Sequence, residues 1–151
     1  LIGDTKGHLG QSALLAEVFN RVEGDAPPVD LEAEKKHGEF IRTNSAWITA
    51  CSDLSDGGLA LAAFEMAEAA NVGVSLDTEG TAELFGEDQA RYLVACNFDQ
   101  AEALLAAAGN LGVPATCVGR FGGTQVSFGA QQAELSELSS IFRNSFADAV
   151  T

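Results

Sequence analysis

The sequence has few basic residues and no long apolar segment. Eight lysines and arginines face 22 aspartates and glutamates, which gives a formal net charge of −14. A surface this acidic repels phosphate backbones and anionic lipid, so we expect neither nucleic-acid binding nor membrane binding. No apolar run approaches the ~20 residues that cross a bilayer. The first residues also lack the basic start and the cleavage site of a signal peptide, so we expect a cytoplasmic protein.

Cysteine is scarce as well. Cys51, Cys96 and Cys117 are odd in number and are widely spaced among apolar residues. No two of them have the spacing of a metal-binding pair. We therefore expect buried free thiols in a reducing compartment.

The chain also lacks an initiator methionine and opens in a strand-like run. Its 151 residues are 46% hydrophobic, which is usual for one globular domain and too apolar for a disordered chain. We expect a single domain over residues 1–151 that is a fragment of a longer protein.

Strand-like and helical patterns mix along the chain. The patterns predict strands near 1–5, 46–51, 72–77, 91–97, 115–121 and 124–128, and helices near 9–22, 30–43, 58–71, 99–109 and 131–149. Gly122 and Gly123 are expected to turn a hairpin between the last two strands. Asp30, after two prolines, is expected to cap the second helix. This mixture predicts a layered α/β or α+β sandwich.

The helix near 58–71 is apolar on most of its circumference. Its apolar residues are Leu59, Leu61, Ala62, Ala63, Phe64, Met66 and Ala70, and only Glu65 and Glu68 mark a polar strip. Such a helix is buried on most sides. Phe64 is expected in the core, as is Trp47.

The stretch SDLSDGG, residues 52–58, separates a strand from this helix. Ser55 or Asp56 could simply cap the helix, while Gly57 and Gly58 allow a sharp turn. The same geometry suits a ligand, because amides at a helix N-terminus attract phosphate. Asp53 could then bind Mg²⁺, which takes a few carboxylates together with phosphate oxygens. Without further context the capped turn is favoured.

The stretch GDTKGHLGQSALL, residues 3–15, is rich in glycine and opens a helical pattern. Its polar side chains Lys6, His8, Gln11 and Ser12 could bind an anion. They could equally belong to a flexible loop with a solvated lysine, and both interpretations stay open.

The remaining candidates are weaker. Glu87 and Arg91 are four residues apart, so a salt bridge is expected, with support of a neighbouring ligand site as the alternative for Glu87. His37 lies among charged residues and is expected to be solvated. Neither histidine lies near a plausible nucleophile, so no catalytic residue is assigned.

Four stretches in order resemble the phosphoribosylformylglycinamidine synthase family. They are LIGDTKGHLGQSALL, APPVDLEAEKKHGEFIR, SDLSDGGLALAAFEMAEAANVGVSLD and LFGEDQARYLV. The resemblance runs from residue 1 to about residue 129, and implies the C-terminal part of a longer chain. The fold implied is a three-layer α/β/α sandwich around a mixed sheet, like the C-terminal domain of aminoimidazole ribonucleotide synthetase.

The resemblance also implies a reaction and partners. Formylglycinamide ribonucleotide, ATP and glutamine-derived ammonia would give formylglycinamidine ribonucleotide, ADP and phosphate, in an enzyme completed by N-terminal domains, a glutaminase subunit and a small bridging subunit. A homodimer is possible. The isolated fragment is expected to be inactive.

The resemblance to the family motif implies that Asp53 is a ligand of Mg²⁺ and that Ser55 contacts a nucleotide. The other nucleotide or phosphate contacts expected are Gly57, Gly58, His8, Gln11 and Ser12. Three alternatives remain: the equivalent domain of another ATP-dependent synthetase of the superfamily, a vestigial site, and a purely structural or interaction domain.

Overall fold

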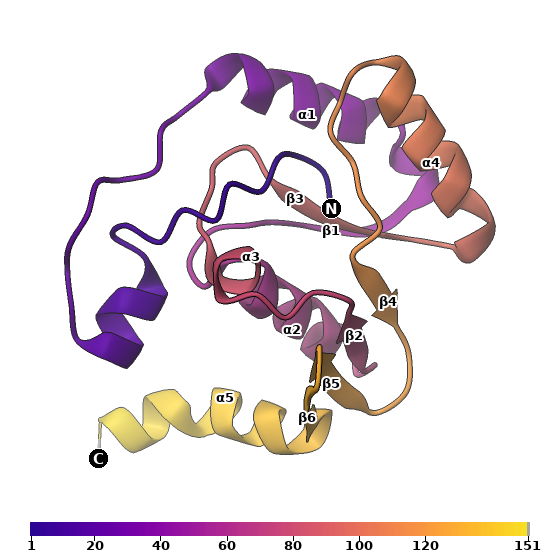
Figure 1. The fold of residues 1–151 in the computed structure, drawn as a ribbon. Coiled ribbons are helices and arrows are strands. Elements are labelled where there is room, and N and C mark those ends of the chain that lie inside the picture. Colours follow the sequence, from indigo (N-terminus) through magenta and orange to yellow (C-terminus); the bar gives the residue numbers. More distant parts are fainter. Residues whose placement is uncertain (151) are drawn as a thin grey trace.

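The structure, a computed structural model, describes residues 1–150 and their side chains except those of 146–148. Residue 151, the last of the expected domain, lies outside the described residues. Helices and strands mix along the chain as predicted, and the α+β class is confirmed (Figure 1).

Six strands form two sheets. In the four-stranded sheet, β2 (Val74–Leu76) lies between β4 (Gly119–Phe121), which is antiparallel to it, and β5 (Gln125–Phe128), which is parallel to it. The fourth strand, β6 (Gln131–Glu134), pairs antiparallel with β5. This sheet is mixed, as expected.

Two of the six strands in residues 1–150 lie outside this sheet. The strands β1 (Ile48–Asp53) and β3 (Tyr92–Cys96) pair antiparallel in a separate two-stranded ribbon. Leu93 of β3 belongs to the core cluster of α2, so α2 packs on this ribbon as well as on the four-stranded sheet.

The expected hairpin at Gly122 and Gly123 is also wrong. Because β2 lies between β4 and β5, these two strands do not pair with each other. The two glycines instead wrap around the start of β2: Gly122 N–H donates to the Gly73 carbonyl at 2.8 Å, and Gly73 N–H donates to the Gly123 carbonyl at 2.9 Å. The hairpin lies one strand later, between β5 and β6, at Gly129 with φ +59°.

Four long helices accompany the sheets: α1 (Leu31–Thr43), α2 (Gly58–Ala70), α4 (Phe98–Asn110) and α5 (Leu135–Ala149). Three short turns complete the elements, the π-helical η1 (Leu14–Val18), the 3₁₀-helical η2 (Ser45–Trp47) and α3 (Thr81–Phe85). The sequence did not predict α3. Asp30 caps α1 as predicted, since its side chain accepts the amides of Glu32 and Ala33.

Four predicted elements differ in extent, and one of them is the strand expected at 115–121, of which only β4 at 119–121 forms. The expected strand at 1–5 is reduced to isolated bridges from Ile2 to Tyr92 and Ala115. The expected helix at 9–22 is reduced to η1, because Gln11 (φ +57°) and Asn20 (φ +52°) have left-handed backbone on either side of it. The expected helix at 131–149 divides into β6 and α5.

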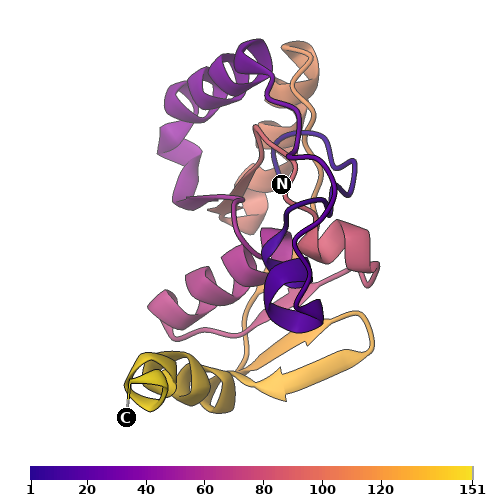
Figure 2. The ribbon, with the colours of Figure 1, turned by 90° about the vertical axis from the view of Figure 1, so that its left-hand side faces the viewer.

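Helix α2 is buried as predicted, with Ala63 and Ala67 both 0% exposed. One core cluster joins α2 to the four-stranded sheet and to α5, where the Phe64 and Phe142 rings meet edge to face at 5.4 Å. A second cluster gathers around Phe40 and Leu104, from α1 and α4. Figure 2 shows α1 and α4 at one end of the molecule and α5 at the other. Phe64 is buried, as predicted. Trp47, which was also expected in the core, is only half-buried and packs against the second cluster.

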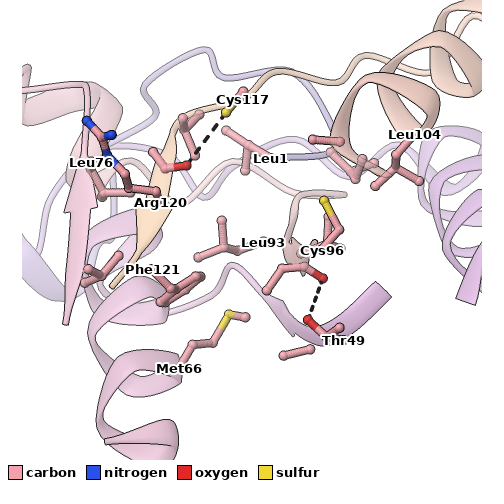
Figure 3. A pocket seen from close by; sticks show the side chains of 18 of the residues that line it. Leu1, Thr49, Met66, Leu76, Leu93, Cys96, Leu104, Cys117, Arg120 and Phe121 are labelled. Atoms are coloured by element: carbon pink, nitrogen blue, oxygen red, sulfur yellow. Dashed lines mark hydrogen bonds between the residues drawn. The ribbon is translucent and has the colours of Figure 1, made fainter. Parts of the chain in front are cut away.

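A mostly apolar cavity of about 700 Å³ lies between the β1–β3 ribbon, β4 and α4 (Figure 3). Cys96 and Cys117 line it. The expectation of buried cysteines is wrong: Cys51 and Cys117 are exposed and Cys96 is half-buried, because β1 is largely exposed and Cys117 lies in the segment before β4. Among residues 1–150, no helix is both long and apolar enough to cross a membrane.

Candidate functional site

The loop of residues 53–58 joins the exposed end of β1 to the buried start of α2. Asp53, Ser55 and Asp56 are exposed, whereas Leu54 between them is 5% exposed. Leu54 N–H donates to the Arg91 carbonyl at 3.0 Å, which fixes the first half of the loop to the start of β3. Gly57 and Gly58 have φ of +77° and +60°. The sequence therefore needs glycine at both positions to make the turn.

The expected side-chain cap is wrong. Within the described residues, neither Ser55 nor Asp56 caps α2, because the residue directly before the helix is Gly57, which has no side chain to accept an amide. The backbone itself supplies one partner, since Gly58 N–H donates to the Ser55 carbonyl at 3.0 Å. The other partner is remote: Gly57 N–H donates to Glu87 Oε1 at 2.9 Å.

The backbone of the glycine-rich loop, residues 3–13, binds a carboxylate side chain of the same chain. The N–H groups of Lys6, Gly7 and His8 donate to the Asp88 carboxylate at 2.9, 2.8 and 3.2 Å. Asp88 is 5% exposed, and its charge is stabilised by these amides. This loop has the anion-binding geometry considered from the sequence, formed by its backbone rather than by its side chains.

The side chains predicted to bind phosphate in this loop contact neighbouring protein groups. His8 Nε2 lies 2.7 Å from the Asp25 carbonyl, so that nitrogen carries a proton and donates it. Gln11 Nε2 donates to the Gly24 carbonyl at 2.8 Å. Ser12 is 1% exposed, and its hydroxyl accepts the Leu15 amide at 3.4 Å. These three side chains therefore stabilise the conformation of the loop. The fourth candidate, Lys6, is exposed.

Glu87 joins the two loops. Its Oε1 accepts the Ala13 amide at 2.8 Å as well as the Gly57 amide. The expected salt bridge to Arg91 is wrong, because residues 86–91 are not helical and a spacing of four does not bring the two side chains together. Arg91 donates instead to Thr5 Oγ1 at 2.9 Å and to the Gly86 carbonyl at 2.6 Å, with Asp88 Oδ2 4.0 Å from its Nε.

His37 is buried rather than solvated, and this expectation is also wrong. It is 5% exposed, and its Nδ1 donates to the Ala90 carbonyl at 2.7 Å. The reason is that the inner face of α1 packs on the segment that leads into β3. Residues 86–91, which we call the 86–91 segment, thus hold both loops and α1.

Sequence reasoning missed Asp88 entirely and assigned Glu87 the wrong partner. A signal was present, since two adjacent carboxylates and an arginine directly precede a strand in GEDQARYLV. Burial of the guanidinium lowers the pKa of Arg91, and the Asp88 charge acts in the opposite direction. The Asp88 carboxylate therefore offsets part of the cost of burying Arg91.

Tyr92 connects the end of β1 to α1. It pairs with Asp53 across the ribbon, and its hydroxyl donates to Glu34 Oε1. Burial raises the pKa of Tyr92 to about 12, helped by that hydrogen bond and by the charges of Glu34 and Asp53. The phenol therefore stays neutral beside Asp53.

The loop of residues 53–58 suits a metal that arrives with a nucleotide. Across residues 1–150, no three His, Cys, Asp or Glu side chains gather closely enough to hold a metal ion alone. Mg²⁺ does not require such a cage, since it is commonly held by one or two carboxylates with substrate phosphates and water. The exposed carboxylates of Asp53 and Asp56 fit that requirement.

An apolar groove of about 500 Å³ opens beside Gly57, between η1, α2 and α5. Large apolar side chains on its walls are exposed, with Val18 at 67%, Ile141 at 63% and Phe142 at 45%. The face next to the loop is therefore apolar although the chain as a whole is acidic.

Curated relatives match nearly the whole chain. The phosphoribosylformylglycinamidine synthase subunit PurL of Ruegeria sp. (strain TM1040) is 69% identical over 150 residues, which are 99% of this chain and 21% of the relative. The PurL subunit of Roseobacter denitrificans is 66% identical over the same length and with the same coverage. The chain thus spans about a fifth of these relatives.

Solved structures share the fold. T. maritima PurL complexed with FGAR has a TM-score of 0.72 at 18% identity, covering 88% of this chain and 26% of that chain. T. maritima PurL complexed with ATP has a TM-score of 0.66 at 19% identity, covering 87% of this chain and 24% of that chain.

The resemblance predicted from the four motifs is confirmed by a family match. The family model of the AIR synthase related protein, C-terminal domain, matches residues 1–130, which is most of the chain. The chain therefore belongs to the family of AIR synthase related protein C-terminal domains.

Proposed function

We propose that the chain is the C-terminal domain of a phosphoribosylformylglycinamidine synthase subunit and that N-terminal domains complete it in the full-length protein. The observation that carries the proposal is the 69% identity over 150 residues to the Ruegeria PurL subunit. Because the chain covers 21% of that subunit, the rest of the synthetase lies elsewhere in the relative.

In this proposal the full-length protein converts formylglycinamide ribonucleotide, ATP and ammonia into formylglycinamidine ribonucleotide, ADP and phosphate. ATP phosphorylates the amide oxygen, and ammonia then displaces phosphate to leave the amidine. We assign no catalytic residue to this domain. Its contribution is to bind a nucleotide and to complete the fold of the enzyme.

The nucleotide contacts we propose are at the loop of residues 53–58. Asp53 would hold Mg²⁺, and the Ser55 hydroxyl would bind the nucleotide. Support comes from the exposure of both side chains at a turn that glycines keep close to the backbone. When bound, Mg²⁺ would neutralise the repulsion between the phosphates and the Asp53 carboxylate. The polar side chains His8, Gln11 and Ser12 would shape the neighbouring loop.

Partners follow from the same proposal. A glutaminase subunit would supply ammonia, and a small bridging subunit would join it to the synthetase in the cytoplasm. A solved structure named PurLQS from Thermotoga maritima shares this fold, with a TM-score of 0.64. That name supports an assembly of several subunits in the relatives.

The activity is tested with the full-length protein. Formylglycinamide ribonucleotide, Mg-ATP and an ammonium salt are expected to release phosphate, and omission of the ribonucleotide is expected to abolish the release. Phosphate release that does not depend on the ribonucleotide would reject this substrate assignment.

The loop assignment is tested by calorimetric titration of Mg-ADP into the full-length protein and its Asp53→Asn and Ser55→Ala variants. Binding through the loop predicts a large loss of affinity with little change in melting temperature. Equal affinity in all three proteins would remove the loop from the nucleotide site.

A second function, a structural domain that docks against another part of the enzyme, is favoured by two observations. The Gly57 amide, which would bind phosphate, is already satisfied by Glu87, and the groove beside it is apolar. If this is the function of the domain, Ile141→Ser in the groove will weaken assembly of the full-length protein while Mg-ADP affinity stays unchanged.

A further inference from the structure

We propose that Glu87 is a positioning residue for the nucleotide loop of residues 53–58. It would hold that loop in its binding form by joining it to the glycine-rich loop of residues 3–13. The inference rests on the proposed function, because it names the residue that shapes the nucleotide site and adds no new ligand.

The geometry of Glu87 differs from that of an ordinary surface carboxylate. The residue is 9% exposed, and one oxygen, Oε1, accepts the amides of both Gly57 and Ala13 at 2.9 and 2.8 Å. The two amides lie 30 and 74 residues away along the chain. Glu87 therefore makes a direct link between two loops that are far apart in sequence.

The link acts on the backbone that carries the proposed ligands. Gly57 is fixed by Glu87, and the next residue, Gly58, donates to the Ser55 carbonyl at 3.0 Å. On the other side, Leu54 donates to the Arg91 carbonyl. Ser55 and Asp56 are thus anchored from both ends by the 86–91 segment, although their own side chains are exposed.

Glu87 works as a hydrogen-bond acceptor rather than as a charge. Among the ion pairs that the described residues form, Arg91 approaches Asp88, and Glu87 takes part in none of them. The Glu87→Gln variant keeps an oxygen that can accept both amides, so it is expected to bind nucleotide as well as the unmodified protein.

The same anchoring distinguishes Glu87 from Asp88. The Asp88 carboxylate uses both of its oxygens, with Oδ2 accepting Lys6 and Gly7 and Oδ1 accepting His8. An asparagine can accept on only one side, so Asp88→Asn must break part of this set. We therefore expect Glu87→Gln to keep the hydrogen bonds of its carboxylate and Asp88→Asn to lose some of them.

The experiment uses hydrogen exchange in the full-length protein, which reports binding at this loop even if a second nucleotide site exists elsewhere. Protection of the amides of residues 54–60 is followed as Mg-ADP is added, and the dependence on concentration gives a local Kd. Glu87→Ala is expected to raise that Kd at least about tenfold, and Glu87→Gln to change it by less than about twofold.

Two controls separate positioning from loss of stability. Leu104→Ala removes a side chain from the second core cluster, which contains no residue of either loop, and is expected to lower the melting temperature. Glu83→Ala removes an exposed carboxylate four residues away and tests the change of net charge. Neither control is expected to alter the local Kd by more than about twofold.

The outcomes are distinguishable. If Glu87→Ala lowers the melting temperature but leaves the local Kd at the value of Leu104→Ala, the positioning role is rejected. If Glu87→Gln loses as much affinity as Glu87→Ala, the acceptor argument is rejected. If Mg-ADP protects the loop in no protein, or protects it equally in Asp53→Asn, the proposed nucleotide site fails, and the positioning role fails with it.

Discussion

A Cβ atom on Gly58 would lie 2.5 Å from the carbonyl oxygen of Gly86. The carbonyl carbon of Phe85 would be 2.9 Å away, so backbone rather than a flexible side chain closes this space. The start of α2 thus rests directly on the end of α3. This contact explains why the turn into α2 and the 86–91 segment form one unit.

Gly58→Ala is therefore expected to destabilise the chain. The substitution combines left-handed backbone (φ +60°) with a clash against backbone, and we expect the free energy of unfolding to fall by about 2 kcal/mol or more. Urea denaturation measures the change. Gly38→Ala is the matched control: it lies inside α1 with no atom within 4 Å of its Cβ, and is expected to stabilise by up to ~1 kcal/mol. A loss of stability in both variants would contradict the argument.

Two aspartates test which side chains cap helices. The Asp30 side chain accepts the amides of Glu32 and Ala33 at 3.1 and 3.0 Å, so Asp30→Ala is expected to cost ~1 kcal/mol. Asp56 does not cap α2, so Asp56→Ala is expected to change stability by no more than ~0.5 kcal/mol. Thermal unfolding of the two variants side by side gives the comparison. Equal losses would restore the capping role predicted for Asp56 from the sequence.

Local features of the fold were predictable because neighbouring residues determine them. The apolar circumference of α2 predicted its burial, and the position of Asp30 after two prolines predicted a cap. Likewise Gly57 and Gly58 predicted a sharp turn, and both have positive φ in the structure. Each of these depends on residues within a few positions of each other.

Long-range pairings were not predictable from such patterns. Gly122 and Gly123 look like a hairpin turn, yet β2, nearly fifty residues earlier, inserts between β4 and β5. Glu87 and Arg91 have helical spacing, yet Glu87 finds its partners at Gly57 and Ala13. In each case a distant segment supplies the hydrogen-bond partners, and periodicity carries no information about it.

His37 and Asp88 show the same limit in the site. His37 lies among charged residues, and its burial is decided by the contact of α1 with Ala90. Asp88 is buried because three amides of the glycine-rich loop surround its carboxylate. A pattern of charge along the chain predicts solvent exposure for both, and tertiary contacts override it.

Tyr92 gives a pH-dependent prediction that can be measured directly, because it is the single tyrosine of the sequence. Ultraviolet absorbance of tyrosinate should show a midpoint near pH 12 in the folded chain, and near ~10 in urea. Since the folded pKa is raised, the stability that neutral Tyr92 contributes is complete below pH ~10 and is lost as the pH rises toward 12. A midpoint near 10 in the folded chain would contradict the structure.

Glu34→Gln then separates the causes of that shift. Burial is the largest cause, and the hydrogen bond and charge of Glu34 come next, so the variant should lower the pKa of Tyr92 while leaving it above its ordinary value. Glu32→Gln, which removes an exposed carboxylate from the same helix, should leave the titration unchanged. If both variants lower the pKa equally, the effect comes from the net charge of the acidic surface, and the specific contact between α1 and β3 is excluded as its cause.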